Sequence, residues 1–153
     1  MAQRFPHITW WCPQLPPSPK AAAALIAQGT ADWPTQNMAV IGSSLGGFYA
    51  TWLAAHKGCK AVLLNPAIHP ARDLANYIGE HTAWHDPAER FYFAPEFVNE
   101  LQALEVGALP HPERVWALIA KGDEVLDWRE MTARYPGAQQ VVLEGGDHAI
   151  SGF

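Results

Sequence analysis

Short runs of apolar and β-branched residues alternate along this chain with longer stretches of helix-forming residues. The apolar runs predict strands at His7–Cys12, Met38–Gly42, Cys59–Ala67, Arg114–Ala120 and Gln139–Glu144. The intervening stretches predict helices at Lys20–Gln28, Phe48–Gly58 and Asp127–Tyr135. Because strands that alternate with helices of about ten residues form β-α units, the sequence predicts an α/β fold with a mainly parallel sheet flanked by helices.

Residues at the ends of the predicted helices match the preferences of helix caps. Ser18 followed by Pro19 is typical of an N-cap and a first helical turn, and Gly29 ends the same helix. Asp127, with Glu130 three residues later, has the spacing of an N-cap and its capping-box partner. We therefore predict a structural role for Asp127.

The alternation of strands and helices is interrupted between residues 66 and 112. This segment contains prolines, acidic residues and short helical patterns, and we predict no strand in it. Its aromatic residues include Trp84, Phe91, Tyr92, Phe93 and Phe97. A long connection after the carboxyl end of a strand often covers the ligand crevice of an α/β sheet. We therefore predict that residues 66–112 form a lid or pocket wall within a single domain, residues 1–153.

The composition disfavours several classes of protein. The 153 residues are 49% hydrophobic and 16% charged, which is typical of a chain with a core rather than a disordered segment. With a net charge of -5 and scattered Lys and Arg, the chain offers no basic stripe for nucleic acid. The sequence has no long apolar run or signal-peptide pattern, which predicts a cytoplasmic protein without membrane insertion. Cys12, in a predicted buried strand, and Cys59 are expected to be isolated thiols.

The stretch GSSLG, residues 42–46, matches the pattern G-x-S-x-G with Ser44 at its centre. It lies between a predicted strand and a predicted helix, the setting in which this pattern holds a nucleophilic serine on a tight turn. Glycines let the strand and the helix approach each other closely. Ser44 is therefore the candidate nucleophile and the Leu45 amide the candidate oxyanion donor. Ser43, one residue earlier, is the alternative nucleophile.

A serine nucleophile needs a base to take its proton and an acid to orient that base. Asp123 and His148 each follow the carboxyl end of a predicted strand, and the chain order is serine, acid, histidine. We assign Asp123 as the acid and His148 as the base. Glu124 and Asp147 are expected to face solvent, although Asp147 is the alternative acid if Asp123 points away.

Two further histidines, His81 and His85, lie four residues apart, and Asp86 is next to the second. On a helix the two imidazoles could reach one metal ion, but the spacing indicates no third ligand. We favour ordinary surface positions for them and predict neither a metal site nor a cofactor.

Several stretches of the chain together resemble the small YqiA-like esterases of bacteria, a branch of the α/β-hydrolase superfamily. They are PQLPPSP, VIGSSLGGFYATWLA, LLNPAIHP, KGDEVLDWR and LEGGDHAISGF. The resemblance covers most of the chain. It implies an α/β-hydrolase fold, hydrolysis of carboxylic esters without a cofactor, and a triad at Ser44, Asp123 and His148. It implies no particular physiological substrate.

The sequence departs from this family at both ends. YqiA-like proteins begin with a strand that runs into a His-Gly loop, whereas Met1 stands almost directly before the strand expected to come second. Only five residues follow His148, too few for the closing helix. We expect a shortened chain without the loop that supplies the second oxyanion amide. We also expect an unpaired strand edge at Met38–Gly42, which favours association with a second copy.

Together these observations predict a serine carboxylesterase or thioesterase-like hydrolase. Its substrates would be small-molecule esters with short to medium acyl chains, because little chain is available to build a long acyl tunnel. The alternative from another class is a catalytically silent member of the fold that binds acyl groups. A nucleotide-binding protein is disfavoured, since GSSLGG lacks the P-loop lysine and the G-x-G-x-x-G spacing.

Overall fold

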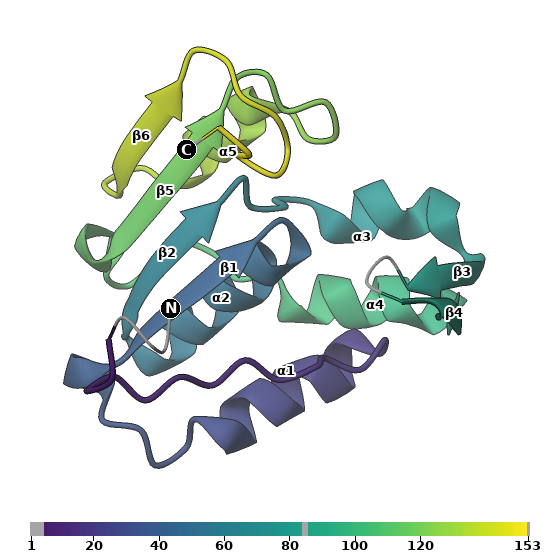
Figure 1. Cartoon of the computed structure of the whole chain (residues 1–153), viewed down its shortest axis with the longest axis horizontal. Coiled ribbons are helices and arrows are strands. Elements are labelled where there is room, and N and C mark those ends of the chain that lie inside the picture. Colours follow the sequence, from purple (N-terminus) through teal and green to yellow (C-terminus); the bar gives the residue numbers. More distant parts are fainter. Residues whose placement is uncertain (1–4, 84–85, 153) are drawn as a thin grey trace.

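The computed structural model describes residues 5–83 and 86–152, which form a parallel sheet, a separate hairpin and surrounding helices (Figure 1). The strands are β1 (Ala39–Ser43), β2 (Lys60–Leu64), β3 (Gly79–Ala83), β4 (Asp86–Phe93), β5 (Val115–Ala120) and β6 (Gln139–Leu143). The α-helices are α1 (Pro19–Gly29), α2 (Leu45–Lys57), α3 (Pro70–Leu74), α4 (Pro95–Leu104) and α5 (Trp128–Arg134). Short 3-10 turns span Thr35–Asn37, Ala75–Tyr77 and Pro112–Arg114. The predicted α/β fold is confirmed.

The helix ends follow the predicted caps. Ser18 Oγ accepts a hydrogen bond from the Ala21 amide at 3.1 Å, and Pro19 is the first residue of α1. Gly58 follows the last turn of α2 with a φ of 70°, a left-handed conformation that glycine adopts without strain. These local signals therefore place both ends of α1 and the end of α2 correctly.

The main sheet has the strand order β1-β2-β5-β6, and each neighbouring pair is parallel. Near its carboxyl edge, Ser43 pairs with Leu64 and Leu64 pairs with Leu118. Ala120 of β5 pairs with Leu143 of β6. Because the strands run in one direction, the loops that follow them leave from the same edge, which is where open α/β sheets bind ligands.

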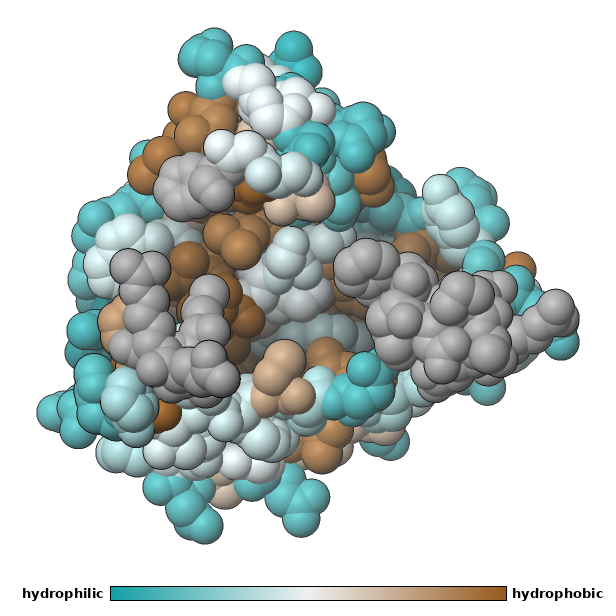
Figure 2. Space-filling view, viewed as in Figure 1, coloured by the Kyte–Doolittle hydropathy of each residue, from teal (hydrophilic) through white to brown (hydrophobic). Residues whose placement is uncertain are grey.

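One face of this sheet is buried and the other is partly open. The buried face packs against α2 and α5, and its side chains include Ala61, Leu63, Ala117 and Ile119. On the opposite face Ile41 and Val141 are 52% and 53% exposed. Figure 2 shows hydrophobic side chains at the surface on the side where the sheet lies in front of α2. Parallel sheets usually carry helices on both faces, so this side leaves apolar surface in contact with solvent.

The outer edge of β1 is open in the described part of the chain. β1 pairs with β2 on one side, and no described strand lies along its other side. An unpaired strand edge presents backbone N–H and C=O groups that another chain can bind. Association with a second copy through this edge stays a prediction.

The prediction of a strand at His7–Cys12 is wrong. Residues 5–17 form an irregular segment, and four of the seven residues in PQLPPSP, which follows the predicted strand, are prolines without an amide hydrogen. The Trp11 indole lies against the end of α1, where a Cβ added to Gly29 would stand 2.3 Å from the ring. Trp11 therefore lies against a helix instead of joining the sheet, and residues 5–12 stay exposed.

The two cysteines lie in different environments. Cys12 is exposed, which corrects its predicted burial in a strand, and Cys59 is buried before β2. Burial raises the pKa of the Cys59 thiol. Both thiols are free, as predicted.

The prediction of no strand between residues 66 and 112 is also wrong. β3 and β4 form an antiparallel hairpin in which Gly79 pairs with Phe93 and Glu80 pairs with Tyr92. The β3 sequence, GEHTA, is short and polar, and β4 begins with residues that are depleted in strands. The hairpin therefore gave no clear alternation of apolar and polar positions.

The aromatic residues of this insertion lie partly inside and partly outside the fold. Phe93 is buried, and its ring centroid lies 5.5 Å from that of Phe97 in an edge-on arrangement. Tyr92 is exposed, and Trp84 lies outside the described residues. The hairpin extends on the side of the molecule toward which the strands of the main sheet run (Figure 1). Its role as a lid or pocket wall stays a prediction.

Among the described residues, no helix is both long enough and apolar enough to cross a bilayer. α2 has 13 residues, whereas a membrane-spanning helix needs about 20.

Candidate active site

Ser44 lies at the turn between β1 and α2. Its φ of 53° and ψ of -121° are uncommon for a residue with a side chain. The Ser44 amide donates to the Leu64 carbonyl at 3.0 Å, and the Ser44 carbonyl accepts from the Gly47 and Ala67 amides, each at 2.9 Å. These backbone hydrogen bonds hold the strained turn in place at the carboxyl edge of the sheet.

The residues on either side of Ser44 have different geometries. Leu45 is the first residue of α2, so its amide N–H has no acceptor within the helix and lies at the positive end of the helix dipole. Such an amide can donate to an oxyanion that forms beside Ser44. Ser43 ends β1 and pairs with Leu64 in the regular sheet.

Glycines allow the strand and the helix to meet closely at this turn. A Cβ added to Gly42 would stand 2.1 Å from the Gly46 carbonyl oxygen, and a Cβ added to Gly47 would stand 2.7 Å from Pro66 Cβ. Apart from its chain neighbours and the nearby backbone of α2, a Cβ added to Gly46 would meet no heavy atom within 4 Å. The steric demand therefore falls on Gly42 and on Gly47, which lies outside the five-residue pattern, and not on Gly46.

We expect Gly42→Ala to lower the free energy of unfolding by about 1–3 kcal/mol, the usual cost of overpacking, because its new methyl group meets backbone that cannot move aside. Gly46→Ala is the matched control and should leave stability unchanged or raise it by up to about 1 kcal/mol, since alanine is the better helix former. Thermal unfolding followed by circular dichroism measures both effects. Equal melting temperatures for the two variants would contradict the steric argument.

Asp123 is fixed by both of its carboxylate oxygens. Its side chain is 0% exposed, and Oδ2 lies 2.8 Å from His148 Nδ1. Oδ1 accepts hydrogen bonds from the Val125 amide at 2.8 Å and the Leu126 amide at 2.9 Å. The loop after β5 therefore orients the carboxylate, and the structure brings Asp123 and His148 together.

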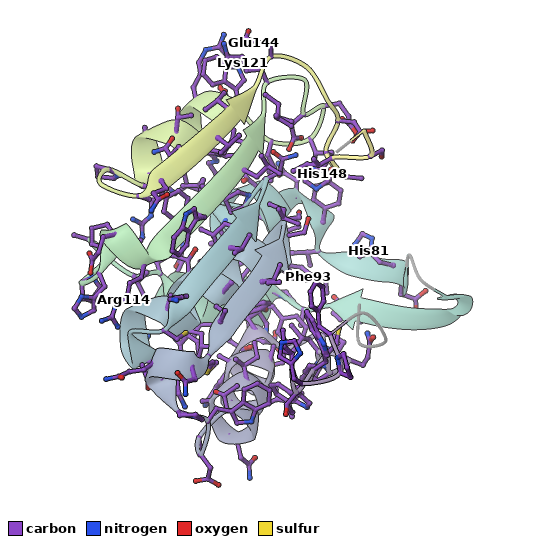
Figure 3. All side chains as sticks on the ribbon, turned by 60° about the vertical axis from the view of Figure 1, so that its left-hand side comes forward. His81, Phe93, Arg114, Lys121, Glu144 and His148 are labelled. Atoms are coloured by element: carbon purple, nitrogen blue, oxygen red, sulfur yellow. The ribbon has the colours of Figure 1, made fainter. Side chains whose placement is uncertain are left out.

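His148 lies on the loop after β6, with 23% of its side chain exposed. Figure 3 shows its ring beneath this loop, on the side of the sheet edge. Because the Asp123 carboxylate accepts a hydrogen bond, Nδ1 carries the proton. Nε2 is then left with a lone pair, which is the tautomer that a general base needs.

The loops that carry Asp123 and His148 approach each other closely at Gly122 and Gly146. Beyond the paired ends of β5 and β6, the Lys121 amide donates to the Leu143 carbonyl at 3.0 Å. A Cβ added to Gly122 would stand 2.2 Å from the Gly146 carbonyl oxygen. The absence of a side chain at Gly122 therefore permits the close approach of the acid loop and the histidine loop.

Asp127 has the predicted capping role, but Glu130 does not act as its capping-box partner. Asp127 Oδ1 accepts a hydrogen bond from the Arg129 amide at 2.8 Å, as an N-cap does. The Glu130 carboxylate instead accepts two hydrogen bonds from the Arg72 guanidinium, each 2.8 Å long, and these hydrogen bonds lower the pKa of Glu130. The Glu130 carboxylate thus pairs with Arg72 instead of closing a capping box.

The structure places Asp123, and not Asp147, against the imidazole of His148. Asp147 Oδ1 accepts a hydrogen bond from the Ser151 amide at 2.8 Å, and backbone hydrogen bonds of this kind lower the pKa of Asp147. The carboxylate of Asp147 is therefore engaged in the C-terminal turn.

Glu124 contributes a contact that the sequence did not indicate. Glu124 is exposed, as expected, but its Oε2 accepts a hydrogen bond from the His148 amide at 3.0 Å. The contact joins residues 24 positions apart, so no local spacing could have revealed it. Asp123 thus binds the ring of His148, and Glu124 binds its backbone.

Of the histidine pair at residues 81 and 85, the structure describes His81 alone. His81 contacts the Tyr77 carbonyl through its ring, and His85 lies outside the described residues. In the described ranges, no group of three or more His, Cys, Asp and Glu side chains is placed to hold a metal ion.

Two of the hollows bounded by described residues lie away from the candidate triad. The smaller has a volume of about 90 Å³ and is bounded in part by Phe48 and Leu104. The larger, about 660 Å³, lies between α3 and α4 around Arg72 and Val98. Neither is lined by Ser44, Asp123 or His148, and the smaller falls below the roughly 300 Å³ of a typical ligand pocket.

A serine turn after one parallel strand, with an acid and a histidine after later strands, is the arrangement of an α/β hydrolase. The structure is similar to that of a putative hydrolase from Agrobacterium vitis S4 (TM-score 0.65, 19% identity, 88% of this chain and 62% of that chain). It is also similar to mouse alpha/beta hydrolase domain-containing protein 10 (TM-score 0.64, 16% identity, 86% and 62%). A third similar structure is Est1E from Butyrivibrio proteoclasticus with ferulic acid bound (TM-score 0.61, 17% identity, 88% and 62%). The fold is therefore that of the α/β hydrolases.

The chain belongs to the uncharacterised protein family UPF0227, whose sequence model matches residues 1–153. The resemblance to the YqiA-like family is thereby confirmed. The chain spans 62% of the length of each of these three solved structures.

Proposed function

We propose that this protein is a serine hydrolase that cleaves small-molecule carboxylic esters or thioesters without a cofactor. The observation that carries the proposal is the 2.8 Å hydrogen bond between Asp123 and His148 at the sheet edge where Ser44 occupies the strained turn. Two similar solved structures are described as esterases: the esterase domain of a Rhodothermus marinus protein and acetyl xylan esterase 1 from a Thermoanaerobacterium species. These names support ester chemistry over other uses of the fold.

In the proposed first half-reaction, Ser44 Oγ attacks the acyl carbon of the ester and His148 Nε2 takes the hydroxyl proton. Asp123 holds the imidazole in the required tautomer and stabilises the imidazolium. The Leu45 N–H donates to the oxygen that becomes negative. The bond to the alcohol oxygen then breaks, and the imidazolium returns the proton to that oxygen, which leaves an acyl group on Ser44.

In the second half-reaction, water attacks the acyl carbon and His148 removes a proton from that water. The bond to Ser44 Oγ breaks, the serine recovers its proton from the imidazolium, and the carboxylic acid leaves. Atoms and charge balance over the cycle, so the chemistry needs only the ester and water.

The rival proposal is a catalytically silent member of the fold that binds acyl groups. Turnover of p-nitrophenyl butyrate separates the two, because a binding module would not release p-nitrophenol repeatedly. We expect steady turnover that is lost after treatment with a fluorophosphonate, which reacts with activated serines. A folded protein that neither hydrolyses the ester nor reacts with the fluorophosphonate would favour the binding module.

We expect the acyl preference to lie at short to medium chains. Neither hollow is lined by the triad, and the hairpin of β3 and β4 is our candidate for the pocket wall. A series of p-nitrophenyl esters from acetate to palmitate, compared by kcat/KM, measures the preference. We expect a decline toward the longest chains, because a short wall leaves their distal carbons in water. A kcat/KM that rises out to palmitate would contradict this expectation.

A further inference from the structure

Asn65 is a fully buried polar residue directly after β2, with 0% of its surface exposed. Its φ of 39° lies in the left-handed region, where asparagine is enriched among residues other than glycine. Its backbone amide donates to the Leu118 carbonyl of β5 at 3.0 Å. Burial of a side-chain amide costs free energy unless the amide is hydrogen-bonded. The hydrogen-bond partners of Asn65 therefore indicate its role.

The side chain of Asn65 joins the two loops that carry the acid and the base. Oδ1 accepts a hydrogen bond from the Ala120 amide at 2.8 Å, at the end of the strand that leads to Asp123. Both amide hydrogens go to the histidine loop, because Nδ2 donates to the Asp147 and His148 carbonyls, each at 3.0 Å. The side-chain oxygen of Asn65 therefore binds the end of β5, and its side-chain nitrogen binds the histidine loop.

The residues beside Asn65 in the chain hold the turn that carries the nucleophile. The Leu64 carbonyl accepts from the Ser44 amide at 3.0 Å, and the Ala67 amide donates to the Ser44 carbonyl at 2.9 Å. Residues 64–67 thus contact the backbone of the serine turn, the acid strand and the histidine loop. Asn65 is the residue in this segment whose side chain reaches His148.

We propose that Asn65 is a positioning residue for His148, an inference that rests on the proposed serine hydrolase function. Asp123 fixes the ring and Glu124 fixes the amide of His148, whereas Asn65 fixes the carbonyls at residues 147 and 148. Together these contacts fix the position and the orientation of the imidazole at the sheet edge. Without the two N–H donors the loop can move, and a displacement of about 1 Å costs roughly 10²-fold in rate.

The test uses two substitutions, Asn65→Asp and Asn65→Gly. Aspartate keeps an acceptor for the Ala120 amide and tolerates the left-handed backbone, but it has no N–H to donate to the histidine loop. Glycine keeps the backbone conformation and removes the side chain. We expect kcat for p-nitrophenyl butyrate to fall by about 10- to 100-fold in both variants, with KM changed by less than about threefold.

A second measurement does not depend on catalysis. Hydrogen–deuterium exchange of a peptide that covers residues 144–152 should rise in both Asn65 variants, whereas exchange in α1 should not. The matched control is Tyr135→Phe, which removes another buried polar group, the hydroxyl that lies 2.9 Å from Thr51 Oγ1. This control should lower stability but leave kcat and the exchange of residues 144–152 at wild-type values.

Wild-type kcat and wild-type exchange at residues 144–152 in the Asn65 variants would overturn the proposal. An equal loss of kcat in Tyr135→Phe would also overturn it, because the effect would then be one of general destabilisation. If the wild-type protein itself shows no ester turnover, the proposed function is wrong, and the exchange data decide alone. Raised exchange would still support the hold of Asn65 on the loop, and unchanged exchange would reject it.

Discussion

Replacing Ser44 with alanine is expected to abolish ester hydrolysis and to leave the protein folded. The substitution removes Oγ, so the base has no hydroxyl to activate, and we expect kcat to fall by about 10⁴-fold or more. Ser44 already holds a φ of 53° without being glycine, and its backbone hydrogen bonds to Leu64 and Ala67 do not involve the side chain. The melting temperature should therefore change little.

Ser43→Ala is the matched control for this prediction. Ser43 ends β1 and pairs with Leu64 in the regular sheet, one residue before the turn. We expect this variant to keep its activity and its reaction with a fluorophosphonate. Peptide mapping after labelling gives an independent readout, because the adduct should form at Ser44. An adduct at any other serine would show that the assignment is wrong.

The strands of the main sheet could be predicted because each is a short apolar run that ends at a helix cap, a turn or a glycine. The same criterion failed at His7–Cys12, where the Trp11 indole lies against the end of α1 and no strand forms. It failed again at β3, whose five residues are mostly polar and pair only with β4. An apolar run alone therefore does not establish a buried strand, since residues 7–12 are all exposed.

The positions of Ser44, Asp123 and His148 could be predicted from chain order and from their places after strands, since parallel strands end at one edge. The contacts of Asn65 could not. Its hydrogen bond to the His148 carbonyl joins residues 83 positions apart, and it involves a backbone group that every residue possesses. No spacing or composition signals such a contact.

Replacing Asp123 with asparagine is expected to reduce kcat by about 10⁴-fold, because it should place the proton of His148 on the wrong nitrogen. The Val125 and Leu126 amides both donate to Oδ1 of Asp123, so the amide oxygen of an asparagine would take that position. The NH₂ group would then face His148 Nδ1, which must become the acceptor. Nε2 would carry the proton and could no longer take the proton of Ser44.

Asp127→Asn is the matched control, since it makes the same chemical change four residues later. Asparagine caps helices about as well as aspartate, so we expect a loss of at most about 1 kcal/mol of stability from the weaker interaction with the dipole of α5. Steady-state kinetics and thermal unfolding of both variants measure the contrast. A large fall in kcat for Asp123→Asn, together with an unchanged kcat for Asp127→Asn, would separate orientation of the base from capping of a helix. Equal losses of kcat at unchanged melting temperatures would mean that the buried carboxylate of Asp123 does not set the tautomer of His148.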